Sequence, residues 1–464
     1  MKIAVIGLGY VGLPLSLQFA RSGVTVLGLD IDPAKVQSLN AGRSYIHHIR
    51  PAAVREQVAA GRFSASTDFA RIREVEAVII CVPTPLKGNR EPDISYILNT
   101  GRAIAPFLKS ENRNQKTKIT DRKFQLSAFP ISAFPKLVVL ESTTYPGTTE
   151  EDLREVLESG GGKAESGNRK AETRLVAGRD FHLAFSPERE DPGNPASRVA
   201  DIPKLVGGYT PACLKRAVAL YRRAVKTVVP MSSCRAAEAT KLLENIFRGV
   251  NIALVNELKV VYDAMGIDIW EVVNAAKTKP FGFMPFYPGP GLGGHCIPID
   301  PFYLAWKARE FGQDTRFIQL AGEINTAMPR LVVERTAAAL KTRKKSVRGS
   351  KILVLGLAYK PDVDDDRESP GYHLLDSLKK RGAKAAYHDP FIPVIRPSRE
   401  HSHWAGTKSV AWSRRIIGSF DAVIICTAHR AVNYRQLAQW ARLIVDTRNA
   451  MAGVKTKPGQ VWKA

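Results

Sequence analysis

The stretch KIAVIGLGYVG, residues 2–12, decides how the N-terminal part of the chain folds. A short apolar run rich in β-branched residues leads into three glycines, Gly7, Gly9 and Gly12, and an amphipathic stretch follows them. The next apolar run ends in Asp30, close to the ~20 residues past the last glycine that a dinucleotide-binding fingerprint shows. A strand before the glycines, a helix after them and an acid at the end of the second strand predict a dinucleotide-binding unit in a parallel sheet.

Each part of this motif has a chemical role. Gly7 permits the tight turn, Gly9 lets the backbone approach a pyrophosphate, and Gly12 allows the helix to pack on the sheet. The N-terminus of that helix then faces the phosphates. Asp30 is predicted to accept hydrogen bonds from the adenosine ribose, and because its carboxylate repels a 2′-phosphate, NAD is favoured over NADP. The alternative, glycines that serve only a tight turn, is disfavoured by the strand, helix and acid around them.

Two further apolar runs, 77–82 and 137–140, are predicted to be buried strands of the same sheet. The first leads into Thr84 and the second into the polar residues 141–144. Ligands of doubly wound sheets bind at the carboxyl ends of the strands. The polar residues at these two strand ends, Thr143 among them, are therefore candidate cofactor contacts.

An internal echo appears in the second half of the chain. KILVLGLAY at 351–359 matches KIAVIGLGY at 2–10, and AVIIC occurs both at 77–81 and at 422–426. The two halves therefore carry the same order of strands, which predicts a second Rossmann-like unit. This unit lacks the second and third fingerprint glycines, so we expect it to bind something other than a second dinucleotide.

A long helix is predicted between the two sheets. From 234 to 266, apolar residues such as Leu242, Leu243 and Leu254 recur at helical spacing, and Gly266 provides a stop. The predicted fold class is α/β, with two Rossmann-like doubly wound parallel-sheet domains joined by a helical central domain that contains this long helix. The expected domains are 1–212, 213–335 and 336–464, with basic insertions at about 109–135 and 163–174 in the first.

The composition suggests an anionic partner. The 464 residues include 68 Lys+Arg against 44 Asp+Glu, a net charge of +24. No run of five or more basic residues and no zinc-finger or RNP-type motif occurs, so a solvated basic surface is favoured over a nucleic-acid-binding face. The 5 cysteines form no C-x-x-C pair, which favours a reducing compartment and disfavours a metal site.

The uncharged stretch 3–20 superficially resembles a signal peptide, but its glycines and Pro14 interrupt the apolar run. No other segment reaches the ~18 consecutive apolar residues that a membrane span needs. We therefore expect a cytoplasmic protein with no membrane partner.

The segment FGFMPFYPGPGLGGHCIPID, residues 281–300, is too rich in glycine and proline for a helix or a regular strand. It presents Cys296 beside His295 and four residues before Asp300, which makes the thiol a candidate nucleophile. A buried apolar thiol or an incidental surface thiol is the alternative interpretation.

Three polar residues lie on one side of the predicted long helix. Lys241, Asn245 and Arg248 follow one another at i, i+4 and i+7. Such a face is usually solvated, so this pattern alone does not identify a site.

Five motifs occur along the chain in a fixed order: GLGYVGLP at 7–14, SPER at 186–189, KLLEN at 241–245, GGHCIPID at 293–300, and GLAYK at 356–360 with RES at 367–369. In these motifs the chain resembles the UDP-glucose/GDP-mannose dehydrogenase family, and within it the bacterial UDP-N-acetylglucosamine 6-dehydrogenases most closely. The resemblance runs essentially from end to end and is interrupted by the two basic segments.

The resemblance implies a four-electron oxidation of a sugar C6 alcohol to a carboxylate, with two NAD+ used in turn. A cysteine would trap the C6 aldehyde as a thiohemiacetal, and a second oxidation would give a thioester that water hydrolyses. The implied catalytic groups are Cys296 as nucleophile, Lys241 for the developing oxyanion, Asn245 and Thr143 for the reacting oxygen or a water, Asp300 as general base, and Glu188 to position sugar and water.

The resemblance also implies an active site between the two Rossmann-like units, a homodimer formed through the central helix, and neither a metal nor a nucleic-acid partner. The implied cofactor contacts are Gly7, Gly9, Tyr10, Val11, Gly12, Asp30, Lys35, Thr84, Thr143 and Arg367. The implied contacts to the UDP-sugar are Glu188, Arg189, Lys241, Asn245, Phe286, Tyr287, Gly289, Gly293 and Lys360.

Several alternatives stay open. The first choice of substrate is UDP-N-acetylglucosamine, but UDP-glucose and UDP-N-acetylmannosamine differ from it at C2, away from the C6 chemistry. A two-electron hydroxyacid dehydrogenase would need neither Cys296 nor a third domain. A non-enzymatic anion-binding protein would use the positive charge and produce no NADH. One departure concerns Pro192, which stands where some relatives have a glutamate that contacts NAD.

Overall fold

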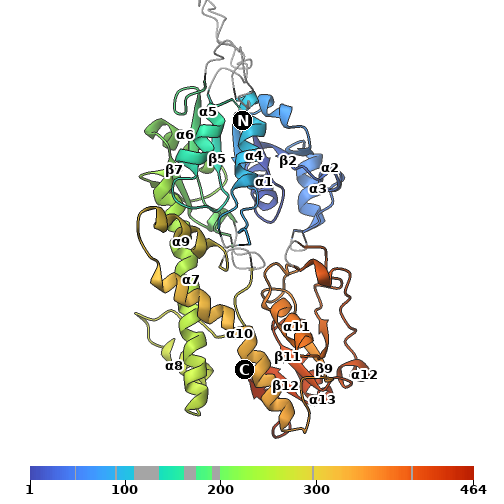
Figure 1. The fold of residues 1–464 in the computed structure, drawn as a ribbon. Coiled ribbons are helices and arrows are strands. Elements are labelled where there is room, and N and C mark those ends of the chain that lie inside the picture. The colour runs from blue at the N-terminus through green and yellow to red at the C-terminus, as the bar shows by residue number, and fades with distance from the viewer. Residues whose placement is uncertain are drawn as a thin grey trace, which may run out of the picture. The chain divides into compact units, whose positions relative to one another are not determined.

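The computed structural model describes residues 1–46, 49–88, 91–108, 135–160, 174–190, 199–294, 297–398 and 401–464. The chain divides into two compact units, Met1–Glu244 and Asn245–Ala464, whose elements are labelled in Figure 1. Among the helices described, none is long and apolar enough to cross a membrane.

The first unit is built on an eight-stranded sheet with the order β3-β2-β1-β4-β5-β6-β7-β8. Each neighbouring pair is parallel except β6 and β7, which confirms the predicted doubly wound parallel sheet. The strand order reverses at β1, between β2 and β4, and ligands of such sheets bind at this reversal. The strands are β1 Lys2–Ile6, β2 Thr25–Leu29, β3 Phe63–Ser66, β4 Ala77–Ile80, β5 Lys136–Leu140, β6 Phe181–Phe185, β7 Lys204–Gly208 and β8 Val228–Met231.

Helices cover both faces of this sheet because its strands are apolar on both sides. Ile3 and Val5 of β1 face one cluster, whereas Ala4 and Ile6 face the other. The helices are α1 Gly12–Arg21, α2 Pro33–Asn40, α3 Pro51–Ala59, α4 Ser95–Ile104, α5 Arg154–Glu158 and α6 Pro211–Tyr221, with shorter helical turns at Phe69–Glu74, Ala105–Phe107, Thr149–Leu153 and Val199–Asp201.

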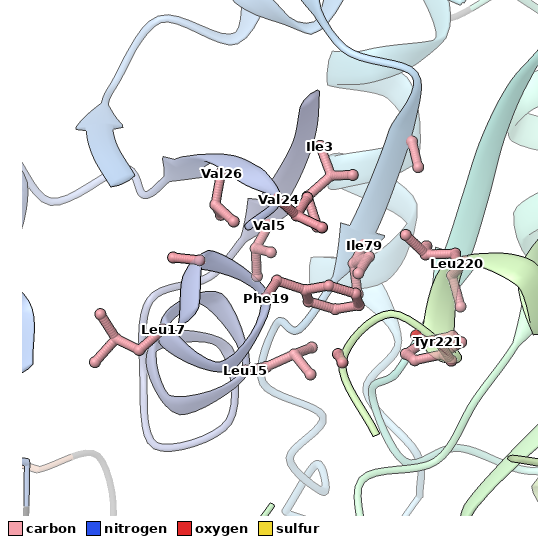
Figure 2. Packing of buried hydrophobic residues seen from close by; sticks show 14 of the residues in the cluster. Ile3, Val5, Leu15, Leu17, Phe19, Val24, Val26, Ile79, Leu220 and Tyr221 are labelled. Atoms are coloured by element: carbon pink, nitrogen blue, oxygen red, sulfur yellow. The ribbon is translucent and has the colours of Figure 1, made fainter. Parts of the chain in front are cut away.

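Figure 2 shows the cluster on which α1 and α6 converge. The ring of Phe19 on α1 lies 6.0 Å from the ring of Tyr221 on α6, between centroids. Ile79 of β4 belongs to the same cluster and lies close to the ring of Phe19 in this view. The first sheet extends past residue 212, where the sequence analysis ended the N-terminal domain, because β8 pairs with β7. Helix α6, which leads to β8, packs in the cluster that covers this sheet.

The predicted long helix is α7, Cys234–Ala264, which starts in the first unit and continues into the second. Its end is explained by Gly266, whose φ of 74° is readily adopted only by glycine. The apolar residues of α7 do not all face a core. Leu242 is buried, whereas Leu243 and Leu254 are 64% and 51% exposed, because neighbouring positions on a helix point about 100° apart.

The second unit contains a five-stranded parallel sheet with the order β10-β9-β11-β12-β13. This order repeats β2-β1-β4-β5-β6 of the first sheet, which confirms the second Rossmann-like domain. Its strands are β9 Lys351–Leu355, β10 Lys384–His388, β11 Ala422–Ile425, β12 Ile444–Asp446 and β13 Val461–Lys463. The helices of this unit are α8 Ile269–Ala276, α9 Asp300–Glu310, α10 Arg316–Lys341, α11 Pro370–Lys380, α12 Arg414–Ile417 and α13 Tyr434–Trp440, with a short turn at Ser402–Trp404.

Candidate active site

The glycine turn after β1 has the geometry of a phosphate-binding loop. Gly7 adopts φ 88°, and a Cβ there would lie 2.5 Å from the carbonyl oxygen of Cys81. A Cβ on Gly12 would lie 1.9 Å from the oxygen of Gly7. By contrast, no described atom lies within 4 Å of the position of a Cβ on Gly9. Open space therefore lies over the backbone at Gly9, where the motif predicts a pyrophosphate.

The N-terminus of α1 adjoins this open space. Val11 is its N-cap residue and provides no side-chain hydrogen bond. The N–H groups of Leu13 and Leu15 donate to the carbonyl oxygens of Gly9 and Val11 at 3.1 and 3.3 Å, and residue 14 is a proline. Gly12 therefore carries the N–H in the first turn of α1 that has no described acceptor and could meet an anion. Tyr10 is partly buried and packs against the apolar cluster of Figure 2. The two residues predicted as cofactor contacts, Tyr10 and Val11, therefore lie at the start of α1.

Asp30 follows β2 and is 6% exposed. Its Oδ2 accepts from the backbone N–H of Leu8 at 2.9 Å, and its Oδ1 accepts from the N–H of Asp32 at 3.0 Å. The Nζ of Lys35 lies 3.6 Å from Oδ2. The structure therefore fixes the predicted ribose acceptor directly against the glycine turn, with the predicted Lys35 beside it.

Tyr45 is a part of this region that the sequence analysis missed. Its hydroxyl donates to the carbonyl oxygen of Leu8, inside the glycine turn. Burial, followed by the nearby carboxylates of Asp30 and Asp32, raises the pKa of Tyr45 above its ordinary value, so the hydroxyl stays a donor. No motif marks this tyrosine, and only the fold brings it to the turn.

The ends of β4 and β5 lie next to one another, as predicted. Thr84 is buried and Thr143 is half-buried. The Oγ of Ser142 donates to the carbonyl oxygen of Val82 at 2.7 Å and so joins the two strand ends. Both threonines therefore lie at the carboxyl edge of the sheet, where a cofactor is expected.

Glu238 on α7 holds the segment that follows Thr143. Its carboxylate accepts from the N–H of Gly147 at 2.7 Å, from the N–H of Thr149 at 3.0 Å and from the Oγ1 of Thr149 at 2.6 Å. Burial raises the pKa of Glu238 to about 7, and these hydrogen bonds oppose that rise. The sequence analysis missed Glu238, although it lies one helical turn before Lys241.

Two of the three predicted polar residues of α7 are buried rather than solvated. Lys241 is 9% exposed and Asn245 is 1% exposed, whereas Arg248 is exposed. The Nδ2 of Asn245 donates to the Oδ2 of Asp300 at 2.5 Å, and Asp300 is 2% exposed at the start of α9. Two of the predicted catalytic residues are thus brought into direct contact across 55 positions of sequence.

Cys296 and His295 lie outside the described residues, as do Pro192 and most of both basic insertions. Described residues that precede and follow Cys296 in the sequence are positioned by hydrogen bonds. The N–H of Gly294 donates to the carbonyl oxygen of Arg367 at 3.1 Å, and Asp300 is anchored by Asn245.

The predicted substrate loop is packed against α7 and α8. Phe286 meets the ring of Phe247 edge-on at 5.7 Å, and Tyr287 stacks on Trp270 at 5.1 Å. The hydroxyl of Tyr287 donates to the Oδ1 of Asn274 at 2.9 Å. In the described structure these two aromatic rings therefore serve to fix the loop.

The glycines of this loop allow close approach to the C-terminal sheet. A Cβ on Gly289 would lie 2.3 Å from Nη1 of Arg448, and a Cβ on Gly293 would lie 2.9 Å from Tyr359 and from Pro370. Burial lowers the pKa of Arg448. Arg448 was not predicted, and its place two residues after β12 is the signal that could have found it.

Glu188 follows β6 and is held by the backbone. Its Oε1 accepts from the N–H of Arg189 at 2.6 Å and from the N–H of Glu190, while its Oε2 lies 3.5 Å from the Nζ of Lys204. The guanidinium of Arg189 pairs with Glu244 at 2.6 Å and donates to a backbone oxygen at 2.7 Å. Arg189, a predicted substrate contact, is thus already engaged within the first unit.

The C-terminal sheet carries the two remaining predicted contacts. Arg367 forms a two-pronged contact with Asp365, with Nε at 2.9 Å and Nη2 at 2.6 Å. The ammonium of Lys360 lies 5.8 Å from the ring centre of Tyr359. Both residues stand in the segment after β9, which corresponds to the glycine turn of the first sheet.

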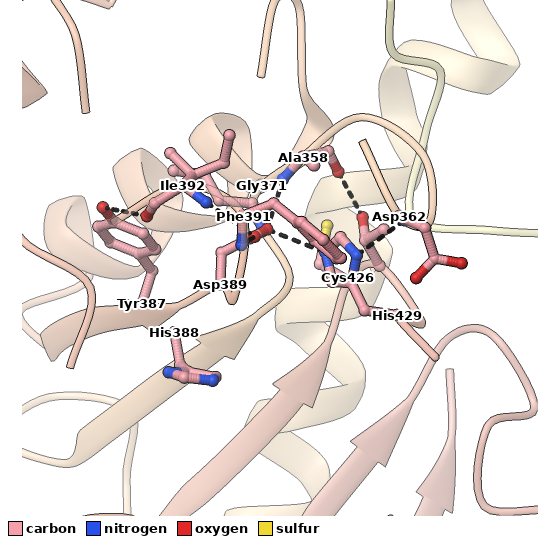
Figure 3. A network of polar contacts seen from close by, with 12 residues as sticks. Ala358, Asp362, Gly371, Tyr387, His388, Asp389, Phe391, Ile392, Cys426 and His429 are labelled. Carbon is pink, nitrogen blue, oxygen red and sulfur yellow. Dashed lines mark hydrogen bonds and ion pairs between the residues drawn. The ribbon is translucent and has the colours of Figure 1, made fainter. Parts of the chain in front are cut away.

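Asp389 occupies the position in the second sheet that Asp30 occupies in the first. Figure 3 shows its carboxylate accepting from the N–H of Ala358 and from the ring of His429, at 2.8 and 2.9 Å. The N–H of Leu357 adds a third bond at 2.6 Å. Since Nδ1 of His429 accepts from the N–H of Asp362 at 3.0 Å, its Nε2 carries a proton and donates the hydrogen bond to Asp389.

This network explains why the second sheet does not repeat the first chemically. Asp389 also accepts from the N–H groups of Phe391 and Ile392, at 2.7 and 3.1 Å, so its oxygens are already occupied. A Cβ on Gly356 would lie 2.3 Å from the oxygen of Thr427. The five donors on Asp389 fill the roughly four acceptor positions of a carboxylate and leave none for a ribose hydroxyl. Asp30, by contrast, accepts from two backbone N–H groups and lies near Lys35. No group of three or more His, Cys, Asp or Glu that could hold a metal occurs in the described part of the chain.

Comparison with known proteins gives matches along most of the chain. The model of the UDP-glucose/GDP-mannose dehydrogenase family matches as three parts: the NAD binding domain at 1–119 and 127–225, the central domain at 235–327 and the UDP binding domain at 353–453.

Named relatives show similar coverage. A UDP-N-acetyl-D-glucosamine 6-dehydrogenase of Pseudomonas aeruginosa is 31% identical, with 97% of this chain and 96% of the relative covered. An NDP-N-acetyl-D-galactosaminuronic acid dehydrogenase of Ralstonia nicotianae is 32% identical, with 96% and 95% covered. The solved structure of a UDP-D-ManNAc dehydrogenase from Pyrococcus horikoshii has a TM-score of 0.82 and 29% identity, and covers 100% of this chain and 99% of that one.

Proposed function

Because the chain belongs to the UDP-glucose/GDP-mannose dehydrogenase family and is an NAD-dependent oxidoreductase of nucleotide sugars, we propose that it oxidises C6 of UDP-N-acetylglucosamine to the carboxylate. The observation that carries the proposal is the buried hydrogen bond between Asn245 and Asp300. Asp300 lies four residues after Cys296 in the sequence. A buried carboxylate fixed by an amide beside a cysteine loop provides the acid–base group that alcohol oxidation needs.

The residues at the first glycine turn fit NAD. Gly9 leaves room for a pyrophosphate, Gly12 at the start of α1 offers its N–H, and Asp30 offers a carboxylate to the ribose. When bound, NAD+ accepts the hydride from C6 in each of the two oxidations. The chain supplies the binding surface and the proton-handling groups.

In the first oxidation, the C6 hydroxyl loses its proton to a base, while the C6 carbon loses a hydride to the cofactor. Asp300, directly or through a water, takes the proton, while Lys241 stabilises the developing alkoxide. Asn245 orients Asp300 through the bond that it donates. Thr143 holds the reacting oxygen or a water.

In the second oxidation, the Cys296 sulfur adds to the C6 aldehyde and forms a thiohemiacetal, whose loss of a hydride gives a thioester. Water, positioned by Glu188, then adds to the thioester carbonyl and releases the thiolate. For each sugar, one water is consumed, two NAD+ are reduced and three protons are released.

The substrate is the finer part of the proposal. The segment after β6 and the cysteine loop resemble UDP-N-acetylglucosamine 6-dehydrogenases, and one relative of 31% identity bears that name. Relatives at 32% identity are named for N-acetylmannosamine and N-acetylgalactosaminuronic acid. UDP-N-acetylmannosamine and UDP-glucose are therefore the competing substrates.

A homodimer is also part of the proposal, in the cytoplasm. Large apolar side chains recur on one face of α7 at spacings of four and seven, so they form a single exposed stripe. An exposed stripe of this kind favours burial against a second copy of α7. Its members are Leu243, Phe247, Leu254 and Val261, which are 64%, 46%, 51% and 46% exposed, and Met265, 64% exposed, follows directly after the end of α7.

The substrate is tested by incubating the protein and NAD+ with each of the three UDP-sugars separately. The proposal predicts the highest kcat/KM for UDP-N-acetylglucosamine, and a product that mass spectrometry identifies as its C6 carboxylate. A higher kcat/KM for UDP-N-acetylmannosamine or UDP-glucose would replace that substrate assignment. An aldehyde as the final product would contradict the four-electron reaction.

A further inference from the structure

A buried ion pair in the first unit has no role in the reaction steps proposed for this protein. The Nζ of Lys204, at the start of β7, lies 2.7 Å from the Oε2 of Glu141, at the end of β5. The two side chains are 7% and 0% exposed. Because β7 runs antiparallel to β6, the start of β7 reaches the edge where β5 and β6 end. The pair therefore lies at the carboxyl edge of the sheet.

Tyr221 fixes one side of this pair. Its hydroxyl donates to the Oε1 of Glu141, and its ring is held in the apolar cluster beside Phe19 (Figure 2). Glu141 therefore has both oxygens engaged, one by Tyr221 and one by Lys204. The ammonium of Lys204 therefore pairs with a carboxylate that Tyr221 also binds.

Lys204 also faces Glu188. Its Nζ lies 3.5 Å from the Oε2 of Glu188, while the other oxygen of Glu188 is bound by the backbone of the next two residues. Burial lowers the pKa of Lys204, but the carboxylates of Glu141 and Glu188 outweigh that effect and raise its pKa above the ordinary value. The ammonium therefore stays charged between two carboxylates.

Two further ionisable side chains, Glu190 and Cys81, belong to the surroundings of Lys204. Glu190 adds a third carboxyl, whose Oε1 is buried without a described hydrogen-bond partner. Burial, then Glu188, raises the pKa of Glu190, and burial raises the pKa of the Cys81 thiol that faces the same cluster. Lys204 is thus the cation that pairs with Glu141 and Glu188 in a cluster that also contains Glu190, Cys81 and Tyr221.

We propose that Lys204 is a positioning residue for the reaction, which holds the Glu188 carboxylate in place while Glu141 and Tyr221 hold Lys204. The inference rests on the proposed function, in which Glu188 positions the water that attacks the thioester. A buried lysine that only stabilised the fold would need Glu141 alone, but the geometry gives it Glu188 as well.

The test compares Lys204→Met with Lys204→Arg, and uses Lys226→Met as a matched control because Lys226 forms an exposed pair with Asp201 at 2.6 Å. Lys204→Met is expected to lower kcat at neutral pH by ~10-fold or more, with KM for NAD+ changed by less than ~3-fold. The acid limb of its kcat profile moves to higher pH, because the carboxylates have lost their cation. Lys204→Arg restores part of kcat, and Lys226→Met matches the wild type.

A double variant separates positioning from stability. Glu141→Gln with Lys204→Met removes the pair as a unit, so the melting temperature is expected to recover toward that of the wild type. The acid limb stays displaced, because Glu188 still lacks its neighbouring ammonium. If this double variant recovered both the melting temperature and kcat, or if Lys204→Met kept the wild-type pH profile, the positioning role would be wrong.

A second readout needs no turnover. In a cycle of Lys204→Met and Glu188→Gln on the substrate-free protein, the loss of melting temperature caused by Lys204→Met is expected to be smaller in the Glu188→Gln background. Additive losses would overturn the coupling. Absence of turnover by the wild type on every UDP-sugar would instead count against the proposed function, so the two failures are distinguishable.

Discussion

Replacing Gly9 by alanine separates cofactor binding from folding. The backbone at Gly9 is not in the left-handed region, unlike that of Gly7 at φ 88°. No described atom lies within 4 Å of the new Cβ. The added methyl group therefore strains nothing in the protein itself, and it occupies only the space in which a pyrophosphate would approach the backbone.

The expected magnitudes follow from these contacts. Gly→Ala at an unstrained position raises the free energy of unfolding by about 0.4–1 kcal/mol, because the unfolded chain loses freedom. Losing one backbone hydrogen bond to a charged phosphate costs about 1.5–3 kcal/mol. That loss corresponds to a rise of roughly 10- to 150-fold in the Kd for NAD+.

Gly12→Ala is the contrasting variant. Its Cβ would lie 1.9 Å from the oxygen of Gly7, so α1 would have to move away from the turn. Overpacking of this kind costs about 1–3 kcal/mol. Gly12→Ala should therefore lose both stability and NAD+ affinity, whereas Gly9→Ala should lose affinity alone.

Isothermal titration with NAD+ and urea unfolding of the free protein measure the two quantities. Wild-type affinity in Gly9→Ala would show that no pyrophosphate lies over Gly9. A marked loss of stability in the same variant would show that the space above it is not open.

Glu238→Gln should remove a pH dependence of the free energy of unfolding. Because folding raises the pKa of Glu238 from 4.5 to about 7, the wild type loses about 3 kcal/mol of stability as pH rises through that interval. Urea unfolding at several pH values should show a flatter profile in the variant. An unchanged slope would contradict the raised pKa. Asp30→Asn keeps an acceptor for the N–H of Leu8 but removes the charge that repels a 2′-phosphate, so the ratio of kcat/KM for NAD+ over NADP+ should fall ~10-fold; an unchanged ratio would place the discrimination elsewhere. Leu254→Glu puts a charge in the exposed stripe of α7, so light scattering should give the mass of a dimer for the wild type and of a monomer for the variant. A wild type that is already monomeric would refute the dimer.

The sequence was most informative where structure is local. The glycine turn, the run of β1 and the acid after β2 all lie within about 30 residues, and each was predicted from its own pattern. The echo between 2–10 and 351–359 likewise depends only on matching short segments. Such features need no knowledge of how distant parts of the chain meet.

The residues that sequence analysis missed are joined by long-range contacts. Lys204 meets Glu141 across 63 positions, and Glu238 meets Thr149 across 89. No periodicity encodes such a meeting, because it depends on how the sheet orders its strands. Tyr45 is a third case, 37 positions from its partner Leu8.

The α7 helix shows a different limit. Apolar spacing predicted the helix, but it did not distinguish the residues that face a core from those that are exposed. Leu242 is buried and Leu243 is 64% exposed, although both are leucines one position apart. Burial of that kind is set by the neighbouring elements and not by the helix itself.

The most direct test of the account counts NADH formed per UDP-N-acetylglucosamine consumed, with the sugar limiting and NAD+ in excess. The account predicts two NADH for each sugar in the wild type, and loss of complete oxidation in Cys296→Ser, which cannot form the thioester. One NADH per sugar, or the same yield of carboxylate with and without the Cys296 thiol, would contradict the four-electron mechanism.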